Sequence, residues 1–373
     1  MIAIVYPQFY GVGGIARYLD SFLANLPANH PPIYLMTGDE HQVDRQYPNV
    51  TIVHIPFIAS RFNLLLWTIK ARRILHQLYT AKKIQLVNLH IPPLITGLLL
   101  SSKIPMVLTA HTTYLGMSGR FYREAYFTSQ WSRLEVSCKL WIERRIFKKS
   151  KKIISLTEQG RQELLAYEVT APIEVIPNGV DLNAFQPMPV ITKTYDVLFC
   201  GRIETRKGSR AMVDVCQLLI ARKPDINILI VGYGDDDTWV KQHLAALPQV
   251  TLTGKVSFTE MRAHYAQCKL YASASYYEGL PGTCLEAMAM GLPAVVWDFP
   301  FYHGLVVPQK TGLLVKPNAN MAMVEAIITL LKNMQQGHDL AHATAQHIQM
   351  HYNWQVLSKA ILTTLQDVHN THA

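Results

Sequence analysis

Two glutamates, Glu278 and Glu286, are separated by seven residues that include a glycine-containing turn. Glu278 precedes the turn, and Glu286 lies on the helix expected at residues 281–290. Such a turn presents unpaired backbone N–H groups at a helix N-terminus, an arrangement that binds anions. A carboxylate farther along the helix could reach the hydroxyl groups of a sugar, whereas on an ordinary surface helix it would face solvent. The small apolar neighbours of Glu286 favour the binding role.

Two cations follow the strand expected at residues 196–200. Arg202 and Lys207 lie on the loop 201–208, which ends where another helix is expected to begin. Open α/β sheets bind ligands at the carboxyl ends of their strands, and this loop lies at such an end. The planar fork of an arginine and the point charge of a lysine suit a diphosphate. The alternative is a solvated basic loop, but the position at the sheet edge favours the diphosphate.

A glycine-rich loop, Gly11-Val12-Gly13-Gly14, lies between the first expected strand and the first expected helix. Glycines let the backbone approach a phosphate, although a tight turn also needs them for steric reasons alone. The loop lacks a complete G-x-G-x-x-G pattern, which disfavours a dehydrogenase.

An Asp-x-Asp motif occurs within Asp235-Asp236-Asp237, and such a motif can hold Mg²⁺ or Mn²⁺ on a diphosphate. Acidic residues at the start of a helix are also explained by capping and by the helix dipole, which is the favoured interpretation here. Because Arg202 and Lys207 already supply positive charge, we expect no metal and no cofactor.

Alternating strands and helices must position these groups. We expect strands at residues 2–6, 51–55, 86–89, 106–110, 152–156, 196–200, 227–231, 250–252, 269–272, 294–297 and 312–315. We expect helices at residues 15–26, 208–222, 238–246, 259–267, 281–290, 321–333 and 353–367. This alternation predicts doubly wound α/β units with parallel sheets. A turn-rich linker near residues 180–192 divides the chain into an N-terminal domain at 1–185 and a C-terminal domain at 186–350, with a helix at 351–373 that could pack back on the first domain.

The composition narrows the class of protein. Of 373 residues, 49% are hydrophobic and 16% are charged, which excludes an intrinsically disordered chain. The best apolar run, residues 94–100, falls short of the roughly 20 residues that a spanning helix needs. The first residues show no signal-peptide pattern, and the five cysteines show no C-x-x-C spacing. We expect a reduced, cytoplasmic protein without a disulfide framework or a zinc site.

Positive charge is concentrated in the first half of the chain. Residues 1–185 hold 20 Lys and Arg against 12 Asp and Glu, whereas residues 186–373 hold 15 against 14. Nucleic acid, an anionic membrane or a phosphorylated substrate would each explain the excess. Residues 61–75 and 140–152 mix Trp and Leu with Arg and Lys, so they could lie on an anionic membrane or pack into the core. The aromatic stretch 114–131 could bind an acceptor or belong to the core.

Taken together, the motifs resemble those of one family. Glu278 with Glu286, Arg202 with Lys207, the glycine loop and the segment 176–181 occur in the order seen in retaining glycosyltransferases of family 4. The resemblance covers nearly the whole chain. It implies a GT-B fold, an α/β architecture in which two Rossmann-like doubly wound domains face each other across a cleft. One departure is the segment 297–304, which stands where the family usually has a Gly-Gly-x-Pro-Glu-like loop.

The resemblance implies a role for each side chain of the second-domain site. Glu286 would hydrogen-bond the ribose of the donor, and Arg202 and Lys207 would neutralise its diphosphate. Glu278 would contact the donor sugar near its reacting carbon.

Backbone groups and the first domain complete the implied site. The backbone N–H groups of Gly279 and Leu280 would bind phosphate. Gly14 would approach the phosphate or the acceptor from the first domain. His111, which follows the strand at 106–110, would lie beside the sugar. The implied catalytic residues are His111, Glu278, Arg202 and Lys207.

The expected function is the retaining, metal-independent transfer of a hexose from a UDP- or GDP-sugar to a lipid-linked or cell-envelope glycan acceptor. We expect the protein to be cytoplasmic and to attach peripherally to the inner face of the cytoplasmic membrane. A sugar phosphorylase or a nucleotide-sugar epimerase of GT-B architecture is the alternative. A basic nucleic-acid-binding protein is the third reading, but no nucleic-acid-binding module is recognisable, so we expect no nucleic acid partner.

Overall fold

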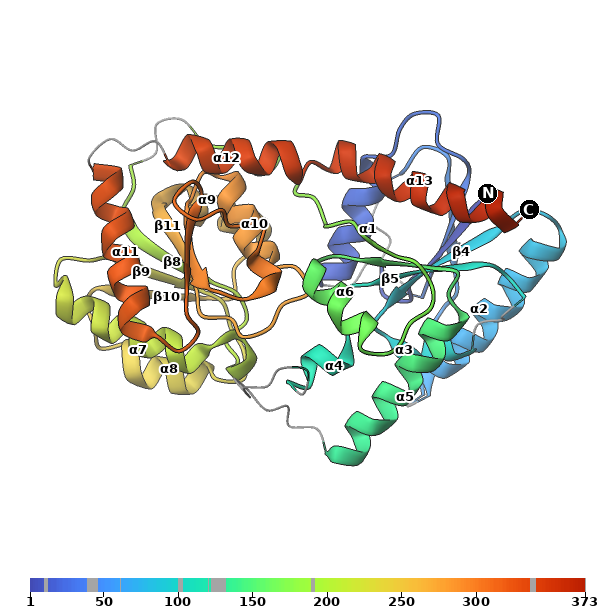
Figure 1. The fold of residues 1–373 in the computed structure, drawn as a ribbon, viewed down its shortest axis with the longest axis horizontal. Helices are drawn as coiled ribbons and strands as arrows, with labels where there is room; N and C mark the ends of the chain where they lie inside the picture. Colours follow the sequence, from blue (N-terminus) through green and yellow to red (C-terminus); the bar gives the residue numbers. More distant parts are fainter. Residues whose placement is uncertain are drawn as a thin grey trace. The chain divides into compact units, whose positions relative to one another are not determined.

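The computed structural model describes residues 1–9, 13–38, 46–60, 62–99, 103–119, 121, 132–188, 192–335 and 340–372. The chain forms two compact units (Figure 1). The first comprises Met1–Gly179 and Trp354–Ala373, and the second comprises Val180–Asn353. The division after Gly179 lies six residues before the boundary expected from the sequence, and the C-terminal helix belongs to the first unit.

The first unit is built on a seven-stranded parallel sheet in the order β3-β2-β1-β4-β5-β6-β7. The central strands β1, β4 and β5 are buried along their whole length, as their continuous apolar runs require. The strands are β1 (Ile2–Val5), β2 (Ile33–Thr37), β3 (Val50–His54), β4 (Leu86–Ile91), β5 (Met106–Ala110), β6 (Lys152–Ser155) and β7 (Ile173–Val175). The strand order reverses between β1 and β4, which marks the place where such sheets bind ligands.

Helices cover the sheet of the first unit. In α1, Tyr18, Leu19, Phe22 and Leu23 are buried at helical spacing. The helices are α1 (Gly14–Ala24), α2 (Asn63–Thr80), α3 (Leu94–Leu99), α4 (Tyr114–Met117), α5 (Arg133–Lys149), α6 (Glu158–Leu165) and α13 (Trp354–His372). Helix α13 packs beside α1, and Figure 1 shows the two helices side by side. The hydroxyl of Ser358 in α13 donates to the carbonyl of Phe22 at 3.4 Å.

The second unit repeats the design with a six-stranded parallel sheet in the order β10-β9-β8-β11-β12-β13. The strands are β8 (Tyr195–Cys200), β9 (Ile228–Val231), β10 (Val250–Gly254), β11 (Cys268–Ser273), β12 (Ala294–Trp297) and β13 (Gly312–Val315). The helices are η1 (Thr205–Lys207), α7 (Ser209–Arg222), α8 (Asp237–Leu244), α9 (Phe258–Gln267), α10 (Gly282–Ala289), η2 (Pro300–Tyr302), α11 (Asn320–Gln335) and α12 (Leu340–His351). The strand order reverses between β8 and β11. Two parallel-sheet units confirm the predicted α/β fold.

The regular elements for which the sequence predicted no range include β2, β7, α3, α4, α6 and α12. Helix α12 buries only Thr344, His347 and Ile348, so its sequence carries little apolar periodicity. Strand β7 has three residues, and none of them is fully buried.

Candidate functional site

The predicted donor-site residues of the second unit lie at the carboxyl edge of its sheet. Arg202 and Lys207 follow β8, and Glu278 follows β11, which pairs directly with β8. Glu286 lies on α10, the helix that comes next. The structure therefore brings these four residues to the point where the strand order of the sheet reverses.

Lys207 and Glu278 form an ion pair, in which the lysine ammonium contacts Oε1 of the carboxylate. The same oxygen accepts a hydrogen bond from the Ser275 hydroxyl at 3.0 Å. Gly208, which follows Lys207, requires glycine: its φ is +72°, and a Cβ there would lie 1.9 Å from the carbonyl oxygen of Ala274. Burial lowers the pKa of Lys207 from its ordinary value, and Glu278 opposes that shift.

Arg202 belongs to a chain of charges that the sequence only partly revealed. Its side chain is 63% exposed and pairs with Glu204 at 2.9 Å. Glu204 also binds Arg206 at 2.6 Å, and Arg206 donates to the carbonyl of Tyr277 at 3.2 Å. The sequence analysis did not name Arg206 as a site residue. Its position as a third cation between Arg202 and Lys207 could have indicated it. It ties the β8 loop to the segment that carries Glu278.

Glu286 is not a solvated surface carboxylate. The hydroxyl of Tyr265, a fully buried residue of α9, donates to its Oε2 at 2.9 Å. In the same first turns of α10, the Thr283 hydroxyl donates to the carbonyl of Cys200 at 3.2 Å. These two contacts fix the position of α10 against α9 and the end of β8.

The N-terminus of α10 is available to an anion. Its N-cap residue, Pro281, makes no side-chain capping hydrogen bond. A Cβ added to Gly282, the first helical residue, would meet no atom within 4 Å. Gly279 and Leu280, which precede the helix, are partly exposed. The helix therefore begins at partly exposed residues close in sequence to Glu278, where its N-terminal dipole favours an anion.

The acidic run has structural partners. Asp236 accepts hydrogen bonds from the hydroxyls of Ser209 and Thr205, the latter at 3.2 Å, and Asp237 pairs with Lys241 at 2.7 Å. Asp236 is the N-cap residue of α8 but makes no side-chain cap, so it joins η1 and α7 to α8 instead. Among the described residues, no group of three or more His, Cys, Asp or Glu is arranged to hold a metal ion.

In the first unit, Gly14 is the first residue of α1 and Gly13 is its N-cap. Both are exposed, Gly13 has extended backbone with a φ of 171°, and a Cβ on either would meet nothing within 4 Å. The fold therefore does not require glycine at these two positions, so the steric explanation fails for them. Gly11 and Val12 of the predicted loop lie outside the described residues.

His111 follows β5 and lies in a buried aromatic cluster. Its Nε2 is 2.9 Å from Nδ1 of His90 on β4, and the Tyr18 ring of α1 meets it edge-on with centroids 4.8 Å apart. Burial lowers the pKa of His111 to about 3, so the ring is neutral at physiological pH. No sequence pattern indicated His90, because its contact with His111 depends on the pairing of β4 with β5.

The two basic helical segments, which correspond to α2 and α5, differ in the exposure of their tryptophans. Trp67 of α2 is buried in the core, so for this tryptophan the membrane-contact reading is wrong. On α5, Leu134 and Trp141 are 76% and 54% exposed, and the Arg145 guanidinium lies over the Trp141 ring. Arg61 and residues 122–131 of the aromatic stretch lie outside the described part of the chain. No described helix is long and apolar enough to cross a bilayer.

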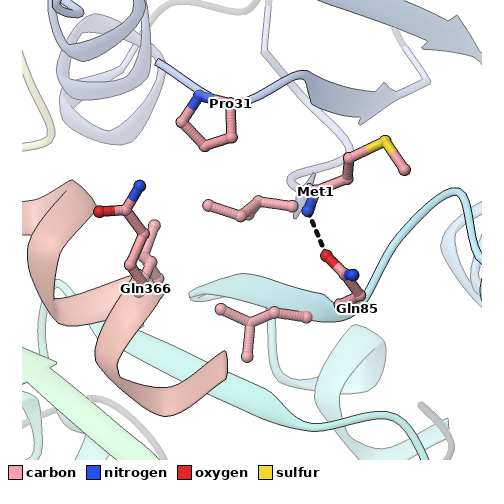
Figure 2. A pocket seen from close by; sticks show the side chains of 7 residues that line it. Met1, Pro31, Gln85 and Gln366 are labelled. Carbon is pink, nitrogen blue, oxygen red and sulfur yellow. Dashed lines mark hydrogen bonds between the residues drawn. The ribbon is translucent and has the colours of Figure 1, made fainter. Parts of the chain in front are cut away.

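A separate cavity of about 360 Å³ lies at the opposite edge of the first sheet (Figure 2). It is lined by the starts of β1 and β4 and by Leu365 and Gln366 of α13. The terminal amine of Met1 donates to Gln85 at 2.5 Å beside it. Because parallel sheets bind substrates at the carboxyl edge, this amino-edge cavity is not the candidate active site.

Comparisons with known proteins agree with this geometry. Residues 12–184 match the sequence model described as Glycosyltransferase Family 4, and residues 183–347 match the one described as Glycosyl transferases group 1. The chain belongs to glycosyltransferase family 4. The two matches together span both units of this glycosyltransferase.

Two relatives match this chain over about half of its length. A phosphatidyl-myo-inositol mannosyltransferase of Mycolicibacterium smegmatis is 31% identical over 204 residues, 52% of this chain and 51% of the relative. A GDP-mannose-dependent monoacylated alpha-(1-6)-phosphatidylinositol monomannoside mannosyltransferase of Corynebacterium glutamicum is 25% identical over 213 residues, 52% of this chain and 56% of the relative. The chain thus spans about half the length of each.

Solved structures confirm the GT-B fold class. Sucrose-phosphate synthase of Thermosynechococcus elongatus matches with a TM-score of 0.80 and 19% identity over 99% of both chains. HepE of Anabaena in complex with UDP and glucose matches with a TM-score of 0.76 and 16% identity over 98% of this chain and 99% of that chain.

Proposed function

We propose that this glycosyltransferase moves a hexose from a nucleoside-diphosphate sugar, with UDP or GDP as the carrier, to a lipid-linked or cell-envelope glycan acceptor. The observation that carries the proposal is the Lys207–Glu278 pair beside the open N-terminus of α10. The names of the mannosyltransferase relatives support a glycolipid acceptor.

In the proposed donor complex, the diphosphate becomes the partner of Lys207, Arg202 and the backbone N–H groups of Gly279, Leu280 and Gly282. Two cations and a helix N-terminus match the charge of a diphosphate without a metal ion. Glu278, released from Lys207, then accepts hydrogen bonds from sugar hydroxyls. Glu286, held in place by Tyr265, accepts them from the ribose.

We further propose that the anomeric configuration of the donor is retained. The bond between the anomeric carbon and the phosphate oxygen breaks, and the acceptor oxygen bonds to that carbon on the same face. The acceptor proton passes to the departing phosphate oxygen. In the proposed complex Glu278 accepts hydrogen bonds from Ser275 and from sugar hydroxyls instead of attacking carbon, which supports substitution without a glycosyl-enzyme intermediate.

The acceptor is proposed to lie at an anionic membrane surface that contacts the outer face of α5. That face carries the apolar Leu134 and Trp141 and the basic Arg145 and Lys148, all exposed. Burial lowers the pKa of Lys149 on α5, and Arg145 and then Arg72 of α2 add to that shift, so the basic surface continues onto α2. Tryptophan with arginine and lysine is typical of an interfacial helix.

The decisive experiment is a thermal-shift panel of UDP, GDP, ADP and their sugars in EDTA. A ligand that binds only the folded state stabilises it, by about 2.7 kcal/mol at one hundred times its Kd. The melting temperature rises as a result. We expect one diphosphate to do so, and its sugar to yield an α-linked product from an α-linked donor by NMR. An inverted product, a sugar phosphate or an epimerised nucleotide-sugar would contradict the proposal. An absolute requirement for Mn²⁺ or Mg²⁺ would instead indicate a metal site at residues 235–237.

A further inference from the structure

Behind His111 lies a buried hydrogen-bonded chain that the proposed mechanism has not used. The side-chain amide of Asn88 donates to the carbonyl of Val107 at 3.2 Å and to the Thr109 hydroxyl at 3.0 Å. Both protons of that amide are therefore directed away from His90. Its carbonyl oxygen, Oδ1, lies 2.9 Å from Nε2 of His90 and can only accept. The proton of His90 must consequently sit on Nε2.

The tautomer of His111 follows from that of His90. Burial lowers the pKa of His90 well below its ordinary value, and His111 adds to that shift, so His90 is neutral and carries one ring proton. With that proton on Nε2, Nδ1 of His90 is a lone pair. Nε2 of His111, 2.9 Å away, must donate to it. The ring of His111 is neutral as well, so its Nδ1 is also a lone pair.

The surroundings of His111 hold this arrangement in place. Asn88 and His90 are each 1% exposed, whereas His111 keeps 8% of its surface. Tyr18 meets both histidine rings, with centroids 5.6 Å from His90 and 4.8 Å from His111. None of the hydrogen bonds found among the described residues reaches Nδ1 of His111.

We propose that Asn88 and His90 are positioning residues that fix His111 in its Nε2–H tautomer, so that Nδ1 of His111 accepts a hydrogen bond from a hydroxyl of the transferred sugar. This inference rests on the proposed function. A group fixed as an acceptor recognises a hydroxyl, which can donate, and discriminates against a carboxylate or a fluorine at the same sugar position, which cannot. It also has no proton to offer the leaving group.

The tautomer is measured directly in the full-length protein labelled with ¹⁵N-histidine. Two-bond ¹H–¹⁵N couplings distinguish the two neutral tautomers, and a His111→Gln variant identifies the signals of His111. We expect the Nε2–H form at pH 7. Finding the Nδ1–H form in the unmodified protein would overturn the proposal.

Asn88→Asp is the sharpest variant because it keeps the shape and puts a negative charge beside His90, while an oxygen replaces the amide donor that faces the Val107 carbonyl and the Thr109 hydroxyl. A carboxylate beside Nε2 of His90 favours a second proton on that ring. His90 would then donate from Nδ1 to Nε2 of His111 and force His111 into the Nδ1–H form. We expect that switch, together with a fall in kcat/KM of roughly 5- to 10-fold for the loss of one hydrogen bond. An unchanged tautomer would count against the relay.

If Asn88→Asp does not fold, His90→Phe keeps a planar ring and removes both ring nitrogens. It should leave His111 as a mixture of tautomers. His30→Gln is the matched control: His30 is another buried histidine of the first unit, bonded to the carbonyls of Pro31 and Pro48, and its loss should leave the signals of His111 unchanged.

Titration with the nucleotide-sugar separates this inference from the proposed function. Accepting a hydrogen bond should move the ¹⁵N signal of Nδ1 of His111 upfield when the donor binds. Saturable donor binding without that movement would overturn the acceptor role alone. A failure of every nucleotide-sugar to bind would contradict the proposed function, while the tautomer in the free protein would still test the relay.

Discussion

The ammonium of Lys207 contacts the carboxylate of Glu278, an oxygen of which also accepts a hydrogen bond from Ser275. The two charges that are proposed to serve the donor therefore neutralise each other before it arrives. A diphosphate that binds Lys207 must compete with Glu278, and a sugar hydroxyl gains Glu278 only when that competition succeeds. Binding of the phosphate and binding of the sugar are thereby coupled at one ion pair.

Replacing Lys207 or Arg202 with alanine should mainly lower kcat. Stabilisation of the departing diphosphate is worth roughly 10²–10³ in rate. Steady-state kinetics with the donor identified above measures the effect. Lys223→Ala, which removes another lysine paired with a carboxylate in the same unit, is the control and should turn over normally. Full activity of both site variants would remove them from the mechanism.

Three glycine-to-alanine variants should separate ligand contact from folding. Gly14→Ala and Gly282→Ala add a methyl group in open space, so their melting temperatures should stay within a few degrees of the unmodified protein. Their donor KM should rise because the methyl group occupies the space of the ligand.

Gly208→Ala is the contrasting case. Its Cβ would lie 1.9 Å from a backbone oxygen at a positive φ, so it should lose stability by roughly 1–3 kcal/mol, measured by urea unfolding. Wild-type KM values in Gly14→Ala and Gly282→Ala would show that no ligand approaches those helix starts.

The positions of these groups, but not their partners, could be predicted from the sequence. Apolar runs predicted the strand β8 and the helix α10. Arg202 follows that strand and Glu286 lies on that helix, so both were expected at the edge of a sheet. Contacts that depend on strand register or on helix packing left no local pattern. His90 meets His111 because β4 and β5 pair in one register, and Tyr265 reaches Glu286 from a neighbouring helix. Sequence periodicity reports which face of an element is buried, and does not report what it is buried against.

The pH dependence of stability should carry a signature of Glu143. Burial raises the pKa of this carboxyl to about 8, although Tyr167 and the backbone of Tyr114 donate to it. The folded protein therefore keeps a proton that the unfolded chain releases above about pH 4.5. Stability should fall as the pH rises from about 5 to about 8, by about 1.4 kcal/mol for each unit of pKa difference.

Glu143→Gln should remove most of that slope, because the amide mimics the protonated acid. Glu135→Gln on the same helix is the control, since Glu135 is an exposed carboxylate paired with Lys139. Chemical denaturation at several pH values gives the comparison. A slope that persists in Glu143→Gln would assign it to other groups.

Attachment to anionic vesicles should depend on the outer face of α5. Each basic residue near such a surface contributes about 1 kcal/mol, so sedimentation with anionic liposomes should decrease as salt increases. The double variant Arg145→Glu with Lys148→Glu should lose binding, and Trp141→Ala should weaken it at all salt concentrations.

The matched control for attachment is Arg222→Glu with Lys241→Glu, which reverses two exposed charges in the second unit. Equal binding to neutral and anionic vesicles would remove the electrostatic contribution. No binding to either would leave α5 as a helix whose outer face meets only solvent.

Because α13 belongs to the first unit, it determines the order in which the two units of a newly made chain can fold. The second unit is one continuous stretch, so it can fold as soon as it has left the ribosome. The first unit, although synthesised earlier, still lacks Trp354, Ile361 and Leu365, which its core buries. A released chain that ends at residue 353 should therefore hold a protease-resistant second unit and an unfinished first one, the reverse of the usual order of synthesis and folding.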